Sequence, residues 1–399
     1  MARRPCSLSA LGLVSCLGAG PAETWRRLVA GDASRLSERT DLAPGRRLLV
    51  GAVREPLPEV PARLARYACR NNALTLAALS QIEEPVRAAL ARFGAHRVGV
   101  VIGTSTSGVG DAEAAIAHHL RTQALSPTFF YDQLEFGGAA GFVAALLGLE
   151  GPAYTLSTAC SSGARALASA RSLLALGVCD AVVAGATDSL CGLTAGGFGA
   201  LQAVAEGITN PMSANRSGIT LGEASALFLV TREPGAIELL GVGESSEAHH
   251  MSAPDPDGRG ARDAMEAALR DAGCAPEAIA YLNLHGTGTP LNDAMESVAV
   301  AGVFGERVPC SSTKPLVGHT LGAAGALEAA FCWLVLQGRD GEELLLPPHA
   351  WDGAADPALP PLRLAAKGER ARAPAPARVM TNSFGFGGNN CTLVLGEAA

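Results

Sequence analysis

Short apolar runs alternate with segments of helical composition along most of the chain. In the first part, four apolar runs predict buried strands, because each is short and ends at glycine or polar residues. Between and before them, segments rich in alanine and leucine predict helices. The predicted strands are residues 97–102, 154–158, 181–185 and 224–230, and the predicted helices are 65–91 with a break near Pro85, 113–120 and 164–176. This alternation predicts an α/β fold with a mostly parallel sheet covered by helices.

The same order of elements restarts in the second half of the chain. The predicted helices there are 262–272 and 293–303, and the predicted strands are 280–284, 379–382 and 391–395. The glycine-rich residues 196–222 are predicted to form loops. No repeat is visible residue by residue, so the duplication rests on the order of elements alone. We therefore predict two similar halves, residues 1–231 and 232–399.

The first sixty residues allow two interpretations. Arg3 and Arg4, an apolar stretch and then Leu-Val-Ser-Cys at 13–16 are similar to a lipoprotein export signal. The alternative is a first core strand, a turn at 18–20 and a helix at 23–29, followed by irregular chain. We favour the core strand, because the rest of the sequence has the composition of a cytosolic enzyme. No apolar run approaches the roughly 18 residues that a membrane span needs.

Composition narrows the class of protein. Of the 399 residues, 48% are hydrophobic and 17% are charged, a balance that fits a well-buried enzyme rather than a disordered or fibrous chain. The net charge of −7 and the lack of any basic run argue against nucleic-acid binding. The ten cysteines form no C-x-x-C pair, so the sequence predicts neither a zinc site nor a disulfide framework. A reducing cytoplasm is the simplest location.

Cys160 has the setting of a nucleophile. It stands between the predicted strand at 154–158 and the predicted helix at 164–176, and two serines and a glycine follow it, which are residue types that begin helices well. The partial positive charge and free N–H groups of a helix N-terminus favour a thiolate over a thiol. A free cysteine is more often only a small buried apolar residue, so this setting alone leaves both interpretations open.

Three later stretches place further reactive side chains at strand ends or helix starts. His285 ends a predicted strand, and Lys314 and His319 stand five residues apart before a small-residue helix that carries Glu328. Residues 382–390 form a glycine-rich turn that can present backbone N–H groups. Singly, each stretch has an ordinary structural explanation. Together with the cysteine they predict one site, because α/β folds gather ligands at the ends of their strands.

A family resemblance rests on four motifs. They are T-A-C-S-S-G at 158–163, H-G-T-G-T-P-x-N-D at 285–293, K-x-x-x-G-H-x-x-G-A-A-G at 314–325 and N-S-F-G-F-G-G-N-N at 382–390. In this order and at these spacings the sequence resembles the elongating branch of the β-ketoacyl-[acyl-carrier-protein] synthases. The resemblance implies an α/β, thiolase-like fold of five αβαβα layers built from two similar halves. The reaction it implies is a decarboxylative Claisen condensation of an acyl thioester with a malonyl thioester, which gives a 3-oxoacyl thioester.

The resemblance also implies a role for each candidate residue. Cys160 would carry the acyl group, and His285 and His319 would stabilise the enolate formed from malonyl thioester. Lys314 would order the polar network of the site, with Glu328 as its partner. The other implied positions are the backbone N–H groups of Cys160 and Phe386 for an oxyanion hole, Thr287 and Thr289 for the pantetheine arm, Phe384 and Phe386 for an aromatic gate, and Thr106 for the depth of the acyl pocket.

The implied partner is acyl carrier protein, whose phosphopantetheine arm brings the substrates, so no metal or redox cofactor is required. We expect a homodimer, with a heterodimer containing a chain-length-factor-like subunit as the alternative. Asn215, where an acid is common, and Ala224, where a glycine is common, place the chain away from the most familiar members of the family. Primary fatty acid synthesis and a specialised polyene or polyketide pathway both remain open.

Other classes fit the sequence less well. A thiolase needs a second catalytic cysteine in the final block, but Cys391 lies beyond the matching segment, in a predicted strand. An initiating synthase uses Cys, His and Asn, whereas this chain has His319 as its second histidine. A non-catalytic chain-length subunit generally lacks the nucleophile, which is present here. A serine hydrolase is unsupported, because the chain has no G-x-S-x-G motif.

Overall fold

Ten of the eleven strands in the central sheet fall into two groups of five. The structure, a computed structural model, describes residues 5–398. The first group contains β1 (Ser7–Ser15), β5 (Val98–Gly103), β6 (Ala153–Leu156), β7 (Ala181–Asp188) and β9 (Ala224–Thr231), and the second contains β10 (Ile237–Ser246), β11 (Tyr281–Asn283), β12 (Cys310–Ser311), β15 (Arg378–Gly385) and β16 (Asn389–Glu397). The eleventh strand, β2 (Gly18–Ala19), pairs with β1.

The two groups share one strand order. The first runs β1–β9–β7–β5–β6 and the second runs β10–β16–β15–β11–β12, and the edge strands β1 and β10 join them. The directions of pairing also correspond, because each group has two parallel and two antiparallel pairings in the same places. This equivalence confirms two similar α/β halves. The prediction of a mostly parallel sheet is wrong. Each group is mixed, because β9 and β16 run antiparallel to both of their neighbours.

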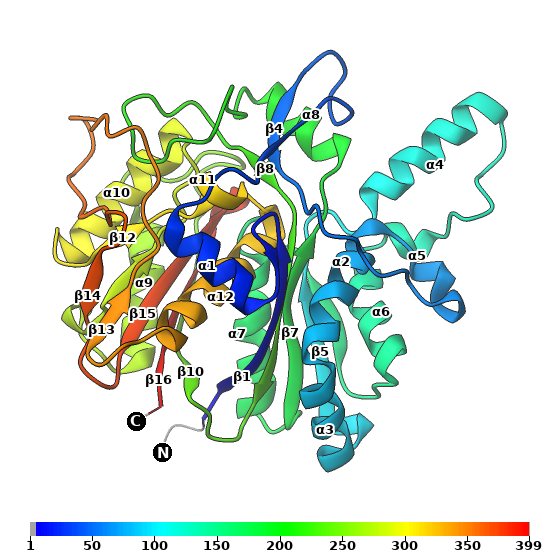
Figure 1. Ribbon diagram of the computed structural model, residues 1–399, viewed down its shortest axis with the longest axis horizontal. Coiled ribbons are helices and arrows are strands. Elements are labelled where there is room, and N and C mark those ends of the chain that lie inside the picture. The colour runs from blue at the N-terminus through cyan, green and yellow to red at the C-terminus, as the bar shows by residue number, and fades with distance from the viewer. Residues whose placement is uncertain (1–4, 399) are drawn as a thin grey trace.

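Helices complete a five-layered arrangement (Figure 1). The middle layer consists of α7 (Ser162–Ala175) and α12 (Ala324–Gln337), which pack against each other between the two groups of strands. On the outer face of the first group lie α2 (Arg70–Leu79), α3 (Glu83–Phe93) and α6 (Gly137–Leu147). On the outer face of the second lies α9 (Arg259–Ala272), with α10 (Pro290–Phe304) beside it. The layers therefore follow the predicted order αβαβα.

Two glycines let the helices of the middle layer meet at their first turns. A Cβ atom on Gly163 would lie 2.5 Å from the backbone nitrogen of Ala326, and one on Gly325 would lie 2.7 Å from the backbone nitrogen of Ala164. Only glycine permits so close an approach of two backbones. The contact brings the segment before α7, which holds Cys160, against the segment before α12, which holds His319.

The predicted helical and loop boundaries need two corrections. The segment 65–91, predicted as helical with one break, is extended at Ala68 and Cys69, between a 3-10 helix (Ala62–Tyr67) and α2. The second interruption is a 3-10 turn at Ser80–Ile82 rather than a break at Pro85, because Pro85 occupies the first turn of α3, where its missing N–H group costs nothing. Residues 196–200, predicted as loop, form the second half of α8 (Gly192–Ala200). Its glycines disfavour a helix, but the carboxylate of Glu113 accepts the N–H groups of Gly192 and Leu193 at 2.9 and 2.6 Å and caps the first turn.

The N-terminal segment forms part of the core. Strand β1 lies inside the sheet, and α1 (Pro21–Ala30) follows it, as the core-strand interpretation predicts. Arg3 and Arg4, on which the export-signal interpretation depended, lie outside the described residues. The following chain, predicted as irregular, contributes β3 (Ser37–Arg39) and β4 (Leu48–Gly51), which form a small sheet with β8 (Leu221–Gly222). In residues 5–398, no helix has the length and apolar character to span a bilayer.

A helical arm projects from the body of the molecule (Figure 1). It consists of α4 (Val109–Thr122) and α5 (Tyr131–Leu134) with the loop between them. Among the described residues, the remaining α-helix is α11 (Lys314–Val317), and the remaining strands are β13 (Glu343–Leu345) and β14 (Arg370–Arg372). The proposed boundary between residues 231 and 232 falls in the connection from β9 to β10 and stays a prediction.

Candidate active site

Cys160 lies in a tight turn between β6 and α7. Ala159, just before it, has a left-handed backbone with φ of 52°, which is costly for a residue with a Cβ atom. The hydroxyl of Ser162 holds the turn, accepting the N–H of Thr158 at 2.9 Å and donating to the carbonyl of Ala159 at 2.6 Å. Such a turn fixes the direction of the Cys160 side chain. The residue is buried, with 7% of its surface exposed.

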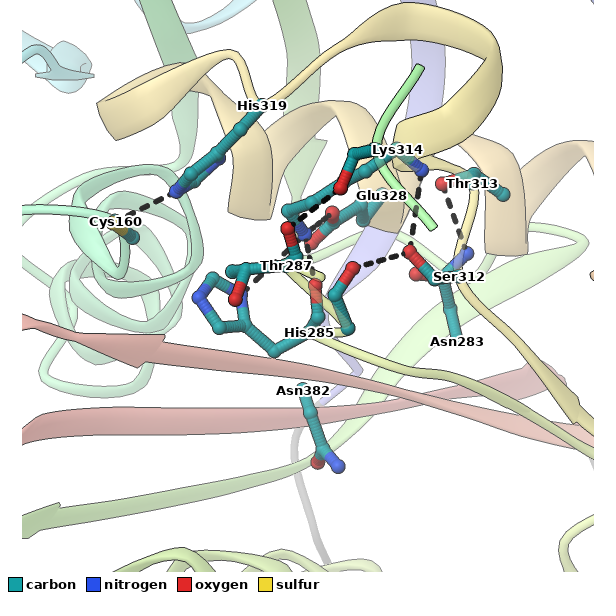
Figure 2. Close-up of polar contacts among 12 residues, drawn as sticks. Cys160, Asn283, His285, Thr287, Ser312, Thr313, Lys314, His319, Glu328 and Asn382 are labelled. Atoms are coloured by element: carbon teal, nitrogen blue, oxygen red, sulfur yellow. Dashed lines mark hydrogen bonds and ion pairs between the residues drawn. The ribbon is translucent and has the colours of Figure 1, made fainter. Parts of the chain in front are cut away.

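His319 faces the sulfur of Cys160. Its Nε2 lies 3.0 Å from Sγ, and Figure 2 shows the two side chains pointing at each other. The backbone of His319 is held by the small sheet, because its N–H donates to the carbonyl of Thr220 at 2.6 Å and its carbonyl accepts the N–H of Gly222 at 3.0 Å. The predicted pair of cysteine and histidine is therefore assembled from segments far apart in sequence.

His285 enters the same site from the end of β11. Its ring and that of His319 meet edge to face, with centroids 5.4 Å apart at 84°. The carboxylate of Glu296 on α10 accepts the N–H groups of His285 and Gly286 at 2.7 and 2.6 Å. The backbone of this histidine is thus anchored by a buried acid, and its side chain is left free to face the cavity.

Lys314 and Glu328 form a buried ion pair behind the histidines (Figure 2). Lys314 Nζ also donates to the carbonyl of His285 and lies 3.5 Å from its Nδ1. Because an ammonium group only donates, Nδ1 presents its lone pair to Lys314, and the ring hydrogen of His285 belongs on Nε2. Burial raises the pKa of Glu328 to about 7, while the charge of Lys314 and its hydrogen bond act in the opposite direction.

We expect Lys314→Met to destabilise the fold by about 3 to 5 kcal/mol, because it leaves the Glu328 carboxylate buried without its partner. Lys314 lowers the pKa of Glu328, which is about 7 in the wild type, so its removal raises the folded-state pKa of Glu328 further above the unfolded value. The difference in the free energy of unfolding between wild type and variant therefore grows as pH rises past about 7, where the wild-type carboxyl ionises and that of the variant does not. Urea unfolding near pH 5.5 and near pH 8 measures both effects.

The exposed pair Arg87 and Glu83 supplies the control for this change. Its side chains are 70% and 47% exposed, so Arg87→Met is expected to change the free energy of unfolding by less than about 1 kcal/mol. If Lys314→Met costs no more than Arg87→Met, the buried pair does not have the role assigned to it here.

The three reacting groups are neutral in the resting site. Burial, followed by the charge of Lys314, holds the pKa values of His285 and His319 well below the ordinary histidine value. Burial likewise raises the pKa of the Cys160 thiol to about 12, although the charge of Lys314 and the backbone N–H of Phe386 lower it. The thiolate expected from the helix N-terminus is therefore not the resting form, because the loss of hydration outweighs the favourable charges.

Alkylation of Cys160 by iodoacetamide should rise about tenfold for each unit of pH from about pH 7 to about pH 10, because only the thiolate reacts. A model thiol with a pKa near 8.5 would level off within that range. The rate is measured by mass spectrometry of the Cys160 peptide, with glutathione as the control. A plateau below pH 8 would mean that the thiolate already exists at neutral pH.

The catalytic candidates line a cavity of about 280 Å³ that opens to the surface. Cys160 and both histidines lie at its inner end, and Thr287 and Thr289, whose hydroxyls are 2.9 Å apart, lie along its wall. The predicted aromatic pair is split: Phe384 is 5% exposed and packs against the His285 ring, whereas Phe386 is 40% exposed and packs against Phe198 of α8. The structure thus brings seven of the predicted residues to one cavity: Cys160, His285, His319, Thr287, Thr289, Phe384 and Phe386.

Thr106 does not line this cavity. It is 1% exposed, and its hydroxyl donates to the carboxylate of Asp188 at 2.8 Å. The loop that carries it nevertheless touches the Cys160 turn, because Ser105 Oγ lies 3.4 Å from the carbonyl of Ala159. Its predicted role in acyl-pocket depth stays a prediction.

A backbone N–H group of the final glycine-rich turn lies against the sulfur of Cys160. The N–H of Phe386 donates toward Sγ, and a Cβ atom on Gly385 would lie 3.3 Å from the backbone nitrogen of Cys160. Glycine at 385 thus lets the final turn lie directly against the nucleophile turn. The oxyanion hole predicted from the N–H groups of Cys160 and Phe386 stays a prediction.

Two supporting acids were missed in the sequence. Asp188 ends β7 and accepts the N–H groups of Ser105, Thr106 and Gly322, so it joins the loop after β5 to the segment after His319. Glu296 lies three residues after Asp293, within a helix. An acid three residues after the predicted apolar strand 181–185 was a visible signal for Asp188, but nothing in the sequence shows which N–H groups either carboxylate accepts.

The ligand atoms of Cys160, His285 and His319 lie within 4.8 Å of one another. Within residues 5–398 this is the one group of histidine, cysteine and acidic side chains whose spacing could hold a metal ion. A metal would need the lone pair of His285 Nε2, where Lys314 favours the hydrogen instead. The residues therefore suit hydrogen-bond donation better than metal binding, and the expectation of a metal-free reaction stays a prediction.

Comparisons with known proteins all find β-ketoacyl synthases. Family models described as "Beta-ketoacyl synthase, N-terminal domain" and "Beta-ketoacyl synthase, C-terminal domain" match residues 4–236 and 236–342. A "3-oxoacyl-[acyl-carrier-protein] synthase 2" from Coxiella burnetii is 32% identical over 418 aligned residues, which cover 99% of this chain and 99% of the relative.

Two solved structures have the same fold. A complex described as the ketosynthase ApeO with its chain length factor ApeC, from Xenorhabdus doucetiae, contains a chain 45% identical to this one, with a TM-score of 0.94 and coverage of 99% and 98% of the two chains. A β-ketoacyl synthase from Burkholderia phymatum is 28% identical, with a TM-score of 0.85 and coverage of 100% of both chains. These likenesses confirm the thiolase-like fold that the motifs imply.

Proposed function

Because the chain belongs to the β-ketoacyl synthase family, we propose that Cys160, His285 and His319 carry out its decarboxylative condensation of acyl and malonyl thioesters. The enzyme is an acyltransferase of the elongating type, and its product is a 3-oxoacyl carrier protein. The observation that carries the assignment of residues is the 3.0 Å contact between Cys160 Sγ and His319 Nε2, with the His285 ring beside them at the end of one open cavity.

Acyl transfer to Cys160 is the first half-reaction. The sulfur attacks the thioester carbonyl of an acyl carrier protein while the N–H at His319 Nε2 donates to Sγ, and the thiol proton passes to the departing phosphopantetheine sulfur. The carrier thus leaves as a free thiol, and the acyl group remains on Cys160. The N–H groups of Cys160 and Phe386 stabilise the negative oxygen that forms during the attack.

Condensation is the second half-reaction. Neutral His285 and His319 donate from Nε2 to the thioester oxygen of the malonyl group, so the bond to its carboxylate breaks, CO2 leaves and the electron pair forms an enolate. The enolate carbon attacks the carbonyl of acyl-Cys160 and the carbon–sulfur bond breaks. Sγ then takes up a proton from solvent, which restores the thiol. No metal or redox cofactor takes part in this sequence.

The remaining predicted positions fit the delivery of substrate. Thr287 and Thr289 stand along the cavity wall, where their hydroxyls can bind the amides of a pantetheine arm. Phe386 lies over the entrance beside Phe198, and its partial exposure suits a gate that moves when substrate enters. Thr106, in the loop that touches the nucleophile turn, is assigned to acyl-chain length.

The partners follow from the same proposal. Acyl carrier protein brings both substrates, and a second subunit of the same fold completes the assembly, either a copy of this chain or a chain-length-factor-like protein. The arm formed by α4 and α5 suits subunit contact, because Ile116, Leu120, Leu125 and Tyr131 on it are 58% to 70% exposed. A cytoplasmic location is part of the proposal, because ten scattered cysteines without a C-x-x-C pair suit a reducing compartment.

The function is tested by incubating the protein with an acyl carrier protein and a malonyl carrier protein, with and without a chain-length-factor-like subunit. We expect a 3-oxoacyl carrier protein two carbons longer than the starting acyl group, with one CO2 released for each product, as measured by mass spectrometry and trapping of CO2. Absence of this product with every acyl chain, in both the presence and the absence of the second subunit, would contradict the proposed function.

A further inference from the structure

His349 lies outside the four motifs, between α12 and β14, yet both of its ring nitrogens are used inside the protein. It is 5% exposed; Nδ1 accepts the N–H of Ser312 at 3.0 Å, and Nε2 donates to the carbonyl of Pro211 at 2.9 Å. These two contacts require opposite roles of the two nitrogens, so the ring is neutral with its hydrogen on Nε2. Burial, which lowers the pKa of His349 to about 4, keeps it so at neutral pH.

Ser312, the first contact of His349, connects it to the turn after His285. The Ser312 hydroxyl donates to the carbonyl of Gly286 at 2.6 Å. A Cβ atom on Gly286 would lie 2.5 Å from Cβ of Ser312, so the two residues are packed as closely as glycine allows. The Ser312 hydroxyl also lies 3.3 Å from the backbone nitrogen of Lys314, which donates to it.

Pro211, the second contact, leads to the same turn from the other side. In the loop around it, the hydroxyl of Thr209 donates to the carbonyl of Thr287 at 2.8 Å. The N–H of Met212 donates to the carboxylate of Asp293, which also accepts the N–H of Gly288 at 3.1 Å. His349 therefore joins two segments that together hold the turn at residues 285–289.

We propose that His349 is a positioning residue that holds the turn after His285 in place for decarboxylation of the malonyl group. Glu296 holds the N–H groups of this turn, and Ser312, fixed by His349, holds its carbonyl at Gly286. Without the imidazole, the buried N–H of Ser312 and carbonyl of Pro211 lose their partners, and both segments can shift. The inference rests on the proposed function, since it assigns His349 to one of its two half-reactions.

The rate of acyl transfer to Cys160 distinguishes this positioning role from a general structural role, because loss of a general structural residue would slow both half-reactions equally. Cys160 is held by Ser162, and His319 is held by backbone groups of Thr220 and Gly222 in the small sheet. The loop around Pro211 meets this support at the Thr220 hydroxyl, which accepts the N–H of Thr209 at 2.8 Å, and not at the backbone groups that bind His319. Displacement of His285 should therefore slow decarboxylation, whereas loading of Cys160 should continue. A displacement of about 1 Å in a reacting group can cost about a hundredfold in rate.

The test compares the full-length wild type with His349→Ala, His349→Asn and Trp351→Leu. In His349→Asn, the amide oxygen of the introduced asparagine can accept the N–H of Ser312 in place of Nδ1, so this variant should recover much of the loss. Trp351 packs edge to face against His349, with ring centroids 5.7 Å apart, and supplies a control that disturbs the packing but keeps the hydrogen bonds. The readouts are the rate of CO2 release from malonyl carrier protein, the rate of acyl loading of Cys160 and the thermal unfolding midpoint.

We expect His349→Ala to slow CO2 release about 10- to 100-fold while acyl loading stays within about threefold of the wild type. His349→Asn should lie between His349→Ala and the wild type, and Trp351→Leu should release CO2 at close to the wild-type rate. Wild-type CO2 release in His349→Ala, or an equal loss of both half-reactions in both His349 variants, would overturn the proposal. Failure of the wild type itself to load acyl groups or release CO2 would instead overturn the proposed function.

Discussion

Replacing Cys160 by alanine is expected to abolish condensation while malonyl decarboxylation remains measurable. Condensation needs an acyl group on Sγ, so removal of the sulfur should lower its rate by about 10⁴-fold or more, the usual scale for loss of a catalytic nucleophile. Decarboxylation needs donors to the malonyl thioester oxygen, and His285 and His319 remain in place around the cavity. The two rates are measured separately, as 3-oxoacyl carrier protein formed and as CO2 released.

Cys274 offers the matched control for this change, because it is a partly exposed cysteine that does not line the cavity. Cys274→Ala should condense at close to the wild-type rate. The assignment of Cys160 as nucleophile is wrong if Cys160→Ala still elongates normally. It is equally wrong if Cys274→Ala loses condensation in its place.

The second large effect is expected at the histidines. His285→Ala and His319→Ala should each lower CO2 release by about 10²- to 10³-fold, the range observed when one donor to a developing oxyanion is removed. His319→Ala should also slow acyl loading of Cys160, because its Nε2 lies 3.0 Å from Sγ. His285 makes no such contact with the sulfur, so loading should be less affected in His285→Ala.

Exposed His96 provides the control, and His96→Ala is expected to leave both half-reactions unchanged. Thermal unfolding of each variant separates loss of a donor from loss of the fold. If either catalytic-site variant is folded and releases CO2 at the wild-type rate, that histidine has no part in stabilising the enolate.

Most of the site can be predicted from the sequence, because the reacting residues lie at strand ends that the local pattern of apolar and small residues indicates. Cys160 closely follows β6, and His285 closely follows β11. Strand β6 lies beside β5 in the first group, and β11 lies beside β15 in the second. A strand end followed by small residues is visible without coordinates. The distance between the two residues is not, because it depends on how α7 and α12 pack through Gly163 and Gly325.

Strand β10 shows why part of the fold could not be predicted. Its residues Gly241 and Gly243 have the composition of a turn, yet they lie inside a ten-residue strand. A Cβ atom on Gly243 would lie 1.9 Å from the carbonyl of Ala264 on α9, so glycine is needed there for close packing of a helix on the strand. Sequence alone does not separate this use of glycine from a turn.

Tertiary contacts also explain the other differences. Helix α8 begins where Glu113, about eighty residues earlier in the chain, accepts its first N–H groups. The protonated state of Cys160 results from burial by segments that the local pattern does not include. Asp188, Glu296 and His349 have their roles through backbone groups brought to them from elsewhere, and a lone acid or histidine in the sequence does not reveal such partners.

Mass spectrometry of the protein after incubation with acyl carrier proteins of different chain length tests most directly whether this sulfur receives the substrate. A mass increase equal to the acyl group is predicted on the peptide that contains Cys160, and it should disappear when malonyl carrier protein is added and the group is passed on. An acyl group found only on another residue, or none with any chain length under conditions where the product still forms, would contradict the account.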